Sequence, residues 1–378
     1  MNFIISLSGI LFNGILDRIA QVMEINTVQT GGLTSFYAYG AIGAPVLILI
    51  LGNMNRNRIL KTMLLGTMIF GILSILTNNF QILLFARFMA GFFGTAYGVI
   101  AITTIASLSS NKNVGRNIVL LISGASAALM IGIPLCRILI EYFSWQMIYL
   151  VLVILMGGGL LSYTILLPES KTNTVKIDLN KEWKLLSTPK VWSIILASFI
   201  VFVGYGAFYT YLTPYLIELF PQIEPYTSGI LVFVGACALI GNSIGGYICD
   251  RIGFARALLY GTELQIFVGF LIFITQNNMV VNILYVFLWM ITGWFIGLQL
   301  NTGINVVSQK RSNFIVSLSG SIIQFSQAVG ASISAIVINQ FGMSMIIFIS
   351  MITSLLCVIF CLLQTIQKQA AIITSENI

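Results

Sequence analysis

The stretch Gly245–Arg256, GGYICDRIGFAR, places a short charged turn between two long apolar runs. The flanking runs, Ser228–Ile248 and Ala257–Thr275, each approach the roughly 20 apolar residues that an α-helix needs to cross a bilayer. Charged side chains are costly inside hydrocarbon, so Asp250 and the two arginines of the turn belong at a membrane surface. The stretch therefore predicts two membrane-spanning helices joined at one face of the membrane.

Apolar runs of the same kind fill the rest of the chain. Of its 378 residues, 58% are hydrophobic and only 8% are charged, and the mean hydropathy is +0.99. A soluble domain carries about 25% charged residues, so a water-soluble globule is excluded. We predict an all-α membrane protein with twelve transmembrane helices over Phe3–Leu16, Gly31–Leu51, Ile59–Thr77, Gln81–Ser107, Asn117–Ile140, Trp145–Leu167, Val191–Leu216, Ser228–Ile248, Ala257–Thr275, Val280–Val307, Phe314–Ile338 and Met343–Leu363.

The residue types exclude several classes of function. The chain has no histidine, which removes Ser-His-Asp catalysis and histidine-bound metals. Its five cysteines all lie in apolar runs, where cysteine usually acts as a small buried hydrophobe. The net charge is +7, but the basic residues do not cluster with aromatic residues as they do in nucleic-acid-binding proteins. We therefore expect no enzyme, no cofactor, no metal site and no nucleic-acid partner.

The basic residues predict the orientation. If the N-terminus is cytoplasmic, the loops on the inner side hold fifteen Lys and Arg residues, and the outer side holds only Arg18. Cytoplasmic loops of membrane proteins carry such an excess of Lys and Arg. We expect a multi-pass protein of the cytoplasmic membrane with both termini in the cytoplasm.

The polar stretch 168–190 divides the chain into two halves of six runs each. A shift of 198 residues lays Ile50–Leu60 over Ile248–Leu258, and both segments are tight turns after the second run of their half. We predict two pseudo-symmetric six-helix bundles, residues 1–167 and 191–378, joined by a cytoplasmic linker over 168–190. The linker is either solvated or lies on the inner leaflet. Two parallel repeats also predict a site between the bundles near the membrane midplane.

Four motifs in these runs resemble the major facilitator superfamily of transporters. The stretch Gly245–Arg256 is similar to that family's inside-loop signature, G-x-x-x-D-R-x-G-x-R, and Arg87–Gly94 is similar to its R-x-x-Q-G pattern. Gly132-Ile133-Pro134 resembles the antiporter signature of the drug/proton branch, and Ala38–Pro45 resembles bacterial sugar-efflux and drug-efflux members. The resemblance covers essentially the whole chain. It implies export of a small organic molecule (a drug-like amphiphile, sugar or metabolite) by alternating access, in exchange for protons.

The chain departs from the family pattern at positions that concern proton coupling. The stretch Ser6–Asn13 in the first expected span carries no acid, and Cys136-Arg137 stands where the antiporter signature prefers glycines. An uncoupled facilitator or uptake carrier therefore stays open as an alternative. So does a membrane sensor or subunit that does not transport.

By the same resemblance, the first, fourth, seventh and tenth spans line a central substrate cavity. Aromatic and amide side chains suit a neutral or cationic amphipathic molecule, or a sugar stacked on rings. Two alternatives to a cavity role stay open. The aromatic residues near Tyr209 would instead form a belt at the membrane interface, and Arg87 would instead bind backbone carbonyls of neighbouring helices. The candidate cavity residues, one of them from the eleventh span, are Asn13, Arg87, Tyr205, Phe208, Tyr209, Trp294, Gln299, Asn301 and Gln324.

Other charged residues and glycines are candidates for conformational gating and for proton coupling. Arg137 and Glu141 are four residues apart, the spacing of a local ion pair on one helix. Candidate proton-coupling acids are Asp17, Glu218 and Glu263. The alternative role of Asp17 and Glu218 is that of solvated acids at helix ends, and Glu263 would instead extend its side chain to the cytoplasmic surface. Besides substrate and protons the expected partner is membrane lipid, and a monomer is expected. The expected gating residues, in the cytoplasmic turn or at close helix contacts, are Gly91, Gly132, Pro134, Asp250, Arg251 and Arg256.

Overall fold

The computed structural model describes residues 1–51, 55–108, 114–166, 186, 188–307 and 313–376. These residues form helices and their connections, and none of them lies in a β-strand. The all-α fold class is thereby confirmed. The predicted linker over 168–190 lies almost entirely outside the described residues.

Nine helices of the described chain are long and apolar enough to cross a membrane. Their surfaces carry large exposed apolar side chains such as Ile69, Phe267 and Ile352, which suit contact with lipid rather than water. The chain is therefore a multi-pass membrane protein. The nine helices are α6 (Arg56–Leu76), α7 (Phe80–Leu108), α10 (Trp145–Leu166), α12 (Pro189–Tyr209), α14 (Thr227–Ile252), α15 (Phe254–Ile274), α16 (Met279–Val307), α17 (Asn313–Phe341) and α18 (Ile346–Glu376).

The other three predicted spans are interrupted helices. The first bends by 70° after a 3₁₀ turn, the second is divided in two, and the fifth contains a π-helical turn. They lie at the positions of the first, second and fifth predicted spans; by length and apolar composition the described residues show nine spans, or ten if the bent first segment counts as one. Their segments are α1 (Asn2–Ile10), η1 (Leu11–Gly14) and α2 (Leu16–Val22); α4 (Gly32–Ala41) and α5 (Gly43–Leu51); and α8 (Val114–Ala127), η2 (Ala128–Gly132) and α9 (Ile133–Leu139).

Proline accounts for most of the interruptions. It lacks the N–H that bonds to the carbonyl four residues earlier, so a helix tends to end or distort there. Pro45 stands four residues after Ala41, where α4 ends, and Pro134 stands four residues after Met130, inside η2. Pro214 likewise follows the point where α12 gives way to α13 (Leu212–Leu219), which divides the seventh span. The break in the first span contains no proline, and Gly14 ends its 3₁₀ turn.

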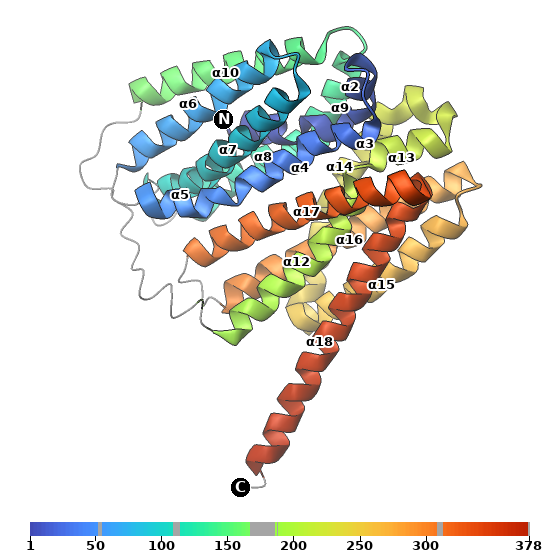
Figure 1. Cartoon of the computed structure of the whole chain (residues 1–378). Helices are drawn as coiled ribbons and strands as arrows, with labels where there is room; N and C mark the ends of the chain where they lie inside the picture. Colours follow the sequence, from blue (N-terminus) through green and yellow to red (C-terminus); the bar gives the residue numbers. More distant parts are fainter. Residues whose placement is uncertain (52–54, 109–113, 167–185, 187, 308–312, 377–378) are drawn as a thin grey trace.

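Packing inside the two bundles repeats six spans apart. α6 packs on α7 as α15 packs on α16, and α4 packs on α7 as α14 packs on α16. Each bundle has its own buried core, around Phe12 and Trp145 in the first and around Phe208 and Trp289 in the second. Figure 1 shows most of the blue-to-green helices on one side and the yellow-to-red helices on the other. The prediction of two pseudo-symmetric six-helix bundles is confirmed.

The bundles meet along two pairs of spans. α4 packs on α17, and η2 and α9 pack on α14. At the second contact Gly235 lies so close to the Met130 backbone that an added Cβ would overlap it. We call the end of the molecule that holds α2 and α13 the Arg18 end, and the opposite end, where α10 ends and α12 begins, the linker end. The short elements α3 (Thr27–Thr30), η3 (Pro221–Tyr226) and η4 (Met343–Met345) belong to the Arg18 end.

Candidate functional site

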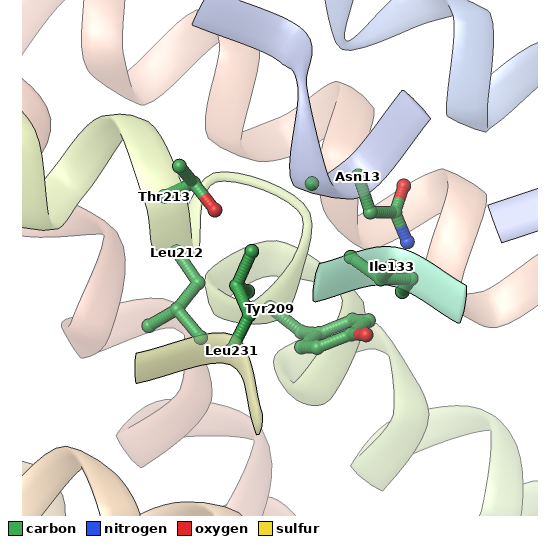
Figure 2. Close-up of a pocket in the computed structure, with 7 residues that line it drawn as sticks. Asn13, Ile133, Tyr209, Leu212, Thr213 and Leu231 are labelled. Atoms are coloured by element: carbon green, nitrogen blue, oxygen red, sulfur yellow. The ribbon is translucent and has the colours of Figure 1, made fainter. Parts of the chain in front are cut away.

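A pocket lies between the two bundles where the first and seventh spans break (Figure 2). The space between its atoms is about 200 Å³, part of it open to the outside. The cavity itself, measured as the space open to a water-sized sphere, is about 10 Å³, so in the present conformation it holds about one water molecule and no drug-sized ligand. It is lined from both bundles by Asn13, Gly14, Ile133, Tyr209, Leu212, Thr213 and Leu231.

The two helix breaks create the pocket. Ile15 leaves the helical conformation between η1 and α2, with φ −135° and ψ 19°. Tyr211 does the same between α12 and α13, with φ −102° and ψ 15°. Asn13 is held at the first break because its Oδ1 accepts a hydrogen bond from the Thr34 hydroxyl at 2.6 Å. Broken helices in corresponding positions of two repeats are a common way to build a binding site inside a membrane.

Stacked aromatic rings form the wall of the second bundle beside the pocket. Tyr209 lines the pocket and stacks on Tyr205, with 5.3 Å between ring centroids. Tyr205 in turn stacks on Trp289 at 5.4 Å, and Phe208 meets Trp289 edge-on at 4.8 Å. Such a wall offers rigid ring faces to a flat or ring-shaped molecule.

Two hydrogen-bond donors beside this wall have no partner among the described residues. They are the buried hydroxyl of Tyr205 and the indole N–H of Trp294, which lie close to each other but form no hydrogen bond of good geometry. Tyr209 and Trp294 each pack against the cores of both bundles, which places them where the bundles meet. A buried donor without an acceptor is unfavourable, so an oxygen acceptor on a bound molecule would satisfy these groups.

Arg87 lies away from the pocket, in the core of the first bundle. Its guanidinium is fully buried and donates to the backbone carbonyls of Ser8 at 2.8 Å, Gly9 at 2.7 Å and Leu33 at 3.2 Å. Its charge also lies 4.6 Å from the centroids of two aromatic rings. Carbonyl dipoles and ring faces therefore surround a cation that makes no ion pair with any described acid. This is the geometry of an anchor that joins the first, second and fourth spans.

The other three amide candidates, besides Asn13, lie in three different places. Gln324 donates from Nε2 to the Thr95 hydroxyl across the bundle interface at 3.3 Å. Gln299 is buried inside the second bundle and donates to the Gly245 carbonyl at 3.0 Å. Asn301 is exposed. The predicted amides therefore do not form one cluster.

The sequence-predicted cavity residues divide into those near the pocket and those away from it. The structure brings together, at the lining or in the wall beside it, Asn13, Tyr205, Phe208, Tyr209 and Trp294. The lining residues that sequence reasoning missed are mostly apolar or small. Nothing in a sequence distinguishes such residues from those that face lipid. They are Gly14, Ile133, Leu212, Thr213 and Leu231.

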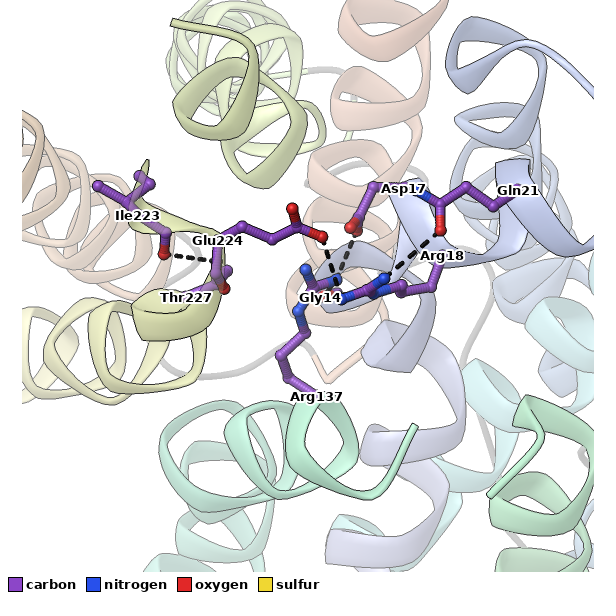
Figure 3. Close-up of polar contacts among 8 residues, drawn as sticks. All are labelled: Gly14, Asp17, Arg18, Gln21, Arg137, Ile223, Glu224 and Thr227. Atoms are coloured by element: carbon purple, nitrogen blue, oxygen red, sulfur yellow. Dashed lines mark hydrogen bonds and ion pairs between the residues drawn. The ribbon is translucent and has the colours of Figure 1, made fainter. Parts of the chain in front are cut away.

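Four charges gather at the Arg18 end (Figure 3). Arg137 Nη1 pairs with Asp17 Oδ1 at 2.6 Å, and Arg18 Nη2 pairs with Glu224 Oε1 at 3.0 Å. The first pair ties α2 to α9 within one bundle, and the second ties α2 to η3 across the bundles. We call these four residues the four-charge cluster.

The expected ion pair between Arg137 and Glu141 is wrong. α9 ends at Leu139, so Glu141 does not continue the helical face of Arg137, and it is exposed. Arg137 instead faces Asp17, because the bend in the first span returns α2 over α9. Glu224 was not predicted. The available signal was Arg18, the one basic residue on the expected outer side.

The three candidate proton-coupling acids differ in burial. Asp17 is largely buried, with 13% of its side chain exposed, and it is paired with Arg137. Glu218 on α13 and Glu263 on α15 are exposed. Among the three, Asp17 has the environment most suited to a functional acid.

The expected gating residues of the first bundle lie at close helix contacts. Gly91 of α7 lies against the Tyr37 backbone of α4 and has no room for a Cβ. Gly132 ends the π-helical turn against the Leu7 side chain, and Pro134 follows at the start of α9. Gly132 and Pro134 therefore shape the fifth span where it meets α14, and Gly91 allows the close packing of α7 on α4.

The signature turn at the linker end is sharp and exposed. Gly253 joins α14 to α15 with φ 80° and ψ 156°, a backbone conformation that other residues adopt only with strain. The Arg251 guanidinium lies 4.2 Å from the centroid of the Tyr247 ring. Asp250, Arg251 and Arg256 are exposed, and none of them forms an ion pair with a described residue. The contacts expected for a closed cytoplasmic end are therefore absent from the described part of the turn.

Comparison with known proteins identifies the family. A sequence model of the Major Facilitator Superfamily matches residues 1–312, well over half of the chain. The chain belongs to the major facilitator superfamily. As a major facilitator protein it is a membrane transporter of small molecules and not an enzyme.

Relatives of this major facilitator protein match nearly its full length. A Bacillus subtilis protein named "Uncharacterized MFS-type transporter YbcL" is 26% identical over 368 residues, covering 96% of this chain and 93% of the relative. A "Probable sugar efflux transporter" of Helicobacter pylori is 25% identical, covering 92% and 90%. The crystal structure of the human organic anion transporter MFSD10 (TETRAN) superposes with a TM-score of 0.68 at 14% identity, over 95% of this chain and 97% of that one. The structural likeness establishes the shared fold.

Proposed function

We propose that this transporter exports a small organic molecule across the cytoplasmic membrane by alternating access. The pocket between the first and seventh spans is its substrate site. The observation that carries the proposal is that both bundles line this small pocket. Rocking of one bundle against the other would therefore open the pocket to one side of the membrane or the other. The relatives named for sugar efflux support the outward direction.

The present conformation is closed at the Arg18 end. The Arg18–Glu224 ion pair crosses between the bundles there, and the Tyr211 hydroxyl donates to the Val28 carbonyl at 3.2 Å, also across the bundles. By the excess of basic residues, the linker end and both termini belong in the cytoplasm and the Arg18 end outside. The structure then corresponds to a state closed to the outside.

The pocket favours an uncharged substrate with a ring face and oxygen acceptors. Its seven lining residues include no charged side chain, so a cation or anion would lose its hydration without finding a partner. The stacked Tyr205 and Tyr209 rings suit a ring face, and the neighbouring Tyr205 hydroxyl and Trp294 indole N–H, which lack a hydrogen bond of good geometry, suit carbonyl, ether or hydroxyl oxygens. A sugar or an aryl glycoside has all of these features.

Exchange for protons is the proposed driving force, with Asp17 as the proton-binding acid. Asp17 is the most buried of the three candidate acids and stands three residues after pocket-lining Gly14. An uncoupled facilitator is the second candidate. The absence of any acid from the pocket lining favours it.

Inverted membrane vesicles with an imposed proton gradient test the function. Sugars, aryl glycosides and neutral drugs are added while pH and labelled-substrate counterflow are recorded. We expect at least one neutral compound to dissipate the gradient, with Asp17→Asn retaining counterflow but losing proton release. Glu141→Gln, which changes an exposed acid at the same end, serves as the control. Counterflow without proton movement would show a facilitator, and silence across the panel would contradict transport.

A further inference from the structure

The direction of α2 depends on contacts outside it. This helix has only seven residues and follows a 70° bend, and a helix so short is not stable by itself. Its first turn carries two adjacent residues of opposite charge, Asp17 and Arg18. Successive side chains of a helix point about 100° apart, so these two reach different neighbours.

Asp17 holds α2 to the fifth span. Its partner Arg137 is 1% exposed, and Arg137 Nη1 also donates to the Gly14 carbonyl at 3.4 Å. Arg137 Nη2 is buried and has no partner among the described residues. A buried cation is strongly unfavourable unless it is paired. Arg137 therefore needs its contacts with Asp17 and Gly14, the residues on either side of the bend. Gly14 also lines the pocket.

Arg18 carries the next contact across to the second bundle. It pairs with Glu224 at the surface, where the side chains are 31% and 39% exposed. The Glu224 carbonyl accepts a hydrogen bond from the Thr227 hydroxyl at 2.8 Å, which fixes η3 to the first turn of α14. One turn further along α14, Leu231 lines the pocket. Both partners of the cross-bundle pair are therefore connected to pocket-lining segments.

We propose that Arg137 is a positioning residue for the gate at the Arg18 end: through Asp17 it holds α2 so that Arg18 closes on Glu224. Figure 3 shows this chain of contacts from α9 through α2 to η3. Because Gly14 and Leu231 touch the pocket from opposite bundles, a molecule that fills the pocket acts on both sides of the gate. The inference rests on the proposed function, since a gate has meaning only for alternating access.

Spin-label distances in lipid nanodiscs test the proposal without any substrate. In a full-length background with the five cysteines replaced, one label pair is placed on exposed Val22 of α2 and Gln222 of η3. A second pair on exposed Thr62 and Ala255 reports the linker end. The wild-type sequence is expected to show mainly the short distance between Val22 and Gln222.

Arg18→Gln and Glu224→Gln remove the cross-bundle pair. We expect each to raise the ratio of long to short distances roughly two- to fivefold, the effect of a partly exposed ion pair. The exchange Arg18→Glu with Glu224→Arg is expected to restore the short distance. These variants establish how the labels respond when the gate itself is weakened.

Arg137→Ala is the decisive variant, because it removes neither member of the cross-bundle pair. We expect it to raise the long-distance population at the Arg18 end as Arg18→Gln does. If Arg137→Ala does not fold, the double variant Asp17→Leu with Arg137→Met removes both charges at once and leaves no unpaired buried ion. The same opening is expected from it. Glu141→Gln, which changes the exposed acid nearest to Arg137 in sequence, is expected to leave the distances unchanged.

The proposal is overturned if the folded Arg137 variant keeps the parental distances while Arg18→Gln opens the gate. It is also overturned if Glu141→Gln opens the gate as far as Arg137→Ala does. Neither readout needs a substrate or a proton gradient. A failed transport assay would therefore leave this test intact, and a failed gate test would leave the transport proposal standing.

Discussion

A cation deep in the first bundle is satisfied here without an acid. Arg87 donates to three backbone carbonyls, two of them from α1 just before its helical hydrogen bonding is interrupted. The sequence predicted that Arg87 must meet a partner or a cavity, because a charge in a span is costly. It could not decide between the two, since carbonyl partners leave no trace in residue types.

Replacing Arg87 by Ala is expected to destabilise the fold. The carbonyls of Ser8 and Gly9, at the end of α1, would lose their donor, at about 1–3 kcal/mol for each unsatisfied group, so we expect a loss of about 2 kcal/mol or more together with loss of transport. Thermal unfolding of the detergent-purified variant measures the first effect, and vesicle transport measures the second. Arg256→Ala, at an exposed position, is the control and should change stability by less than about 0.5 kcal/mol. Parental stability in Arg87→Ala would show that the carbonyl contacts are not an anchor.

Tyr205→Phe is expected to weaken substrate binding without weakening the fold. The hydroxyl of Tyr205 lies near the Trp294 indole N–H without a hydrogen bond of good geometry, so removing it should cost the free protein little. A lost hydrogen bond to the substrate of about 1–1.5 kcal/mol lowers affinity roughly 5- to 12-fold. Tryptophan fluorescence titration with the substrate found in the vesicle assay measures this change.

Tyr215→Phe is the matched control for Tyr205. Its hydroxyl is also buried without a hydrogen bond of good geometry, but Tyr215 packs against Phe208, whereas Tyr205 stacks directly on pocket-lining Tyr209. Equal affinity losses in the two variants would contradict the assignment of Tyr205 to the substrate site.

Individual spans were largely predictable, and their interruptions were not. Apolar length located the nine long helices of the described residues and the positions of the interrupted ones, because a spanning helix must satisfy its backbone internally and cover itself with apolar side chains. The breaks that shape the pocket follow from Pro134, Pro214 and the bend at Gly14, which do not alter hydropathy. The partner of Arg137 was mispredicted for the same reason, since the end of α9 and the bend in the first span decide it.

The turn between α14 and α15 gives a test at the scale of one element. Gly253 has φ 80° and ψ 156°, so Gly253→Ala is expected to cost about 1–3 kcal/mol of stability through backbone strain. Gly229→Ala is the control, because Gly229 lies in α14 with no atom within 4 Å of an added Cβ. That variant should be neutral or up to about 1 kcal/mol more stable. Similar thermal unfolding of the two variants would rule out strain at the turn.

Across the whole molecule, the repeat of six spans positions the pocket. Matching helix contacts in the two bundles place the breaks of the first and seventh spans opposite each other. The internal repeat predicted a site between the bundles, and the aromatic residues of the seventh span indicated its wall. Its apolar lining and the four-charge cluster depend on contacts between residues far apart in sequence, such as Arg18 with Glu224, which spacing alone cannot show.

The most direct test of alternating access is the reactivity of one pocket residue from both sides of the membrane. Leu231→Cys, in a background without the five native cysteines, is treated with a membrane-impermeant thiol reagent in right-side-out and in inverted vesicles. Leu231 lines the small pocket between the bundles. The account predicts slow labelling from both sides, reduced by the transported substrate. Labelling from one side only, or from neither, would contradict a pocket that opens alternately to the two faces.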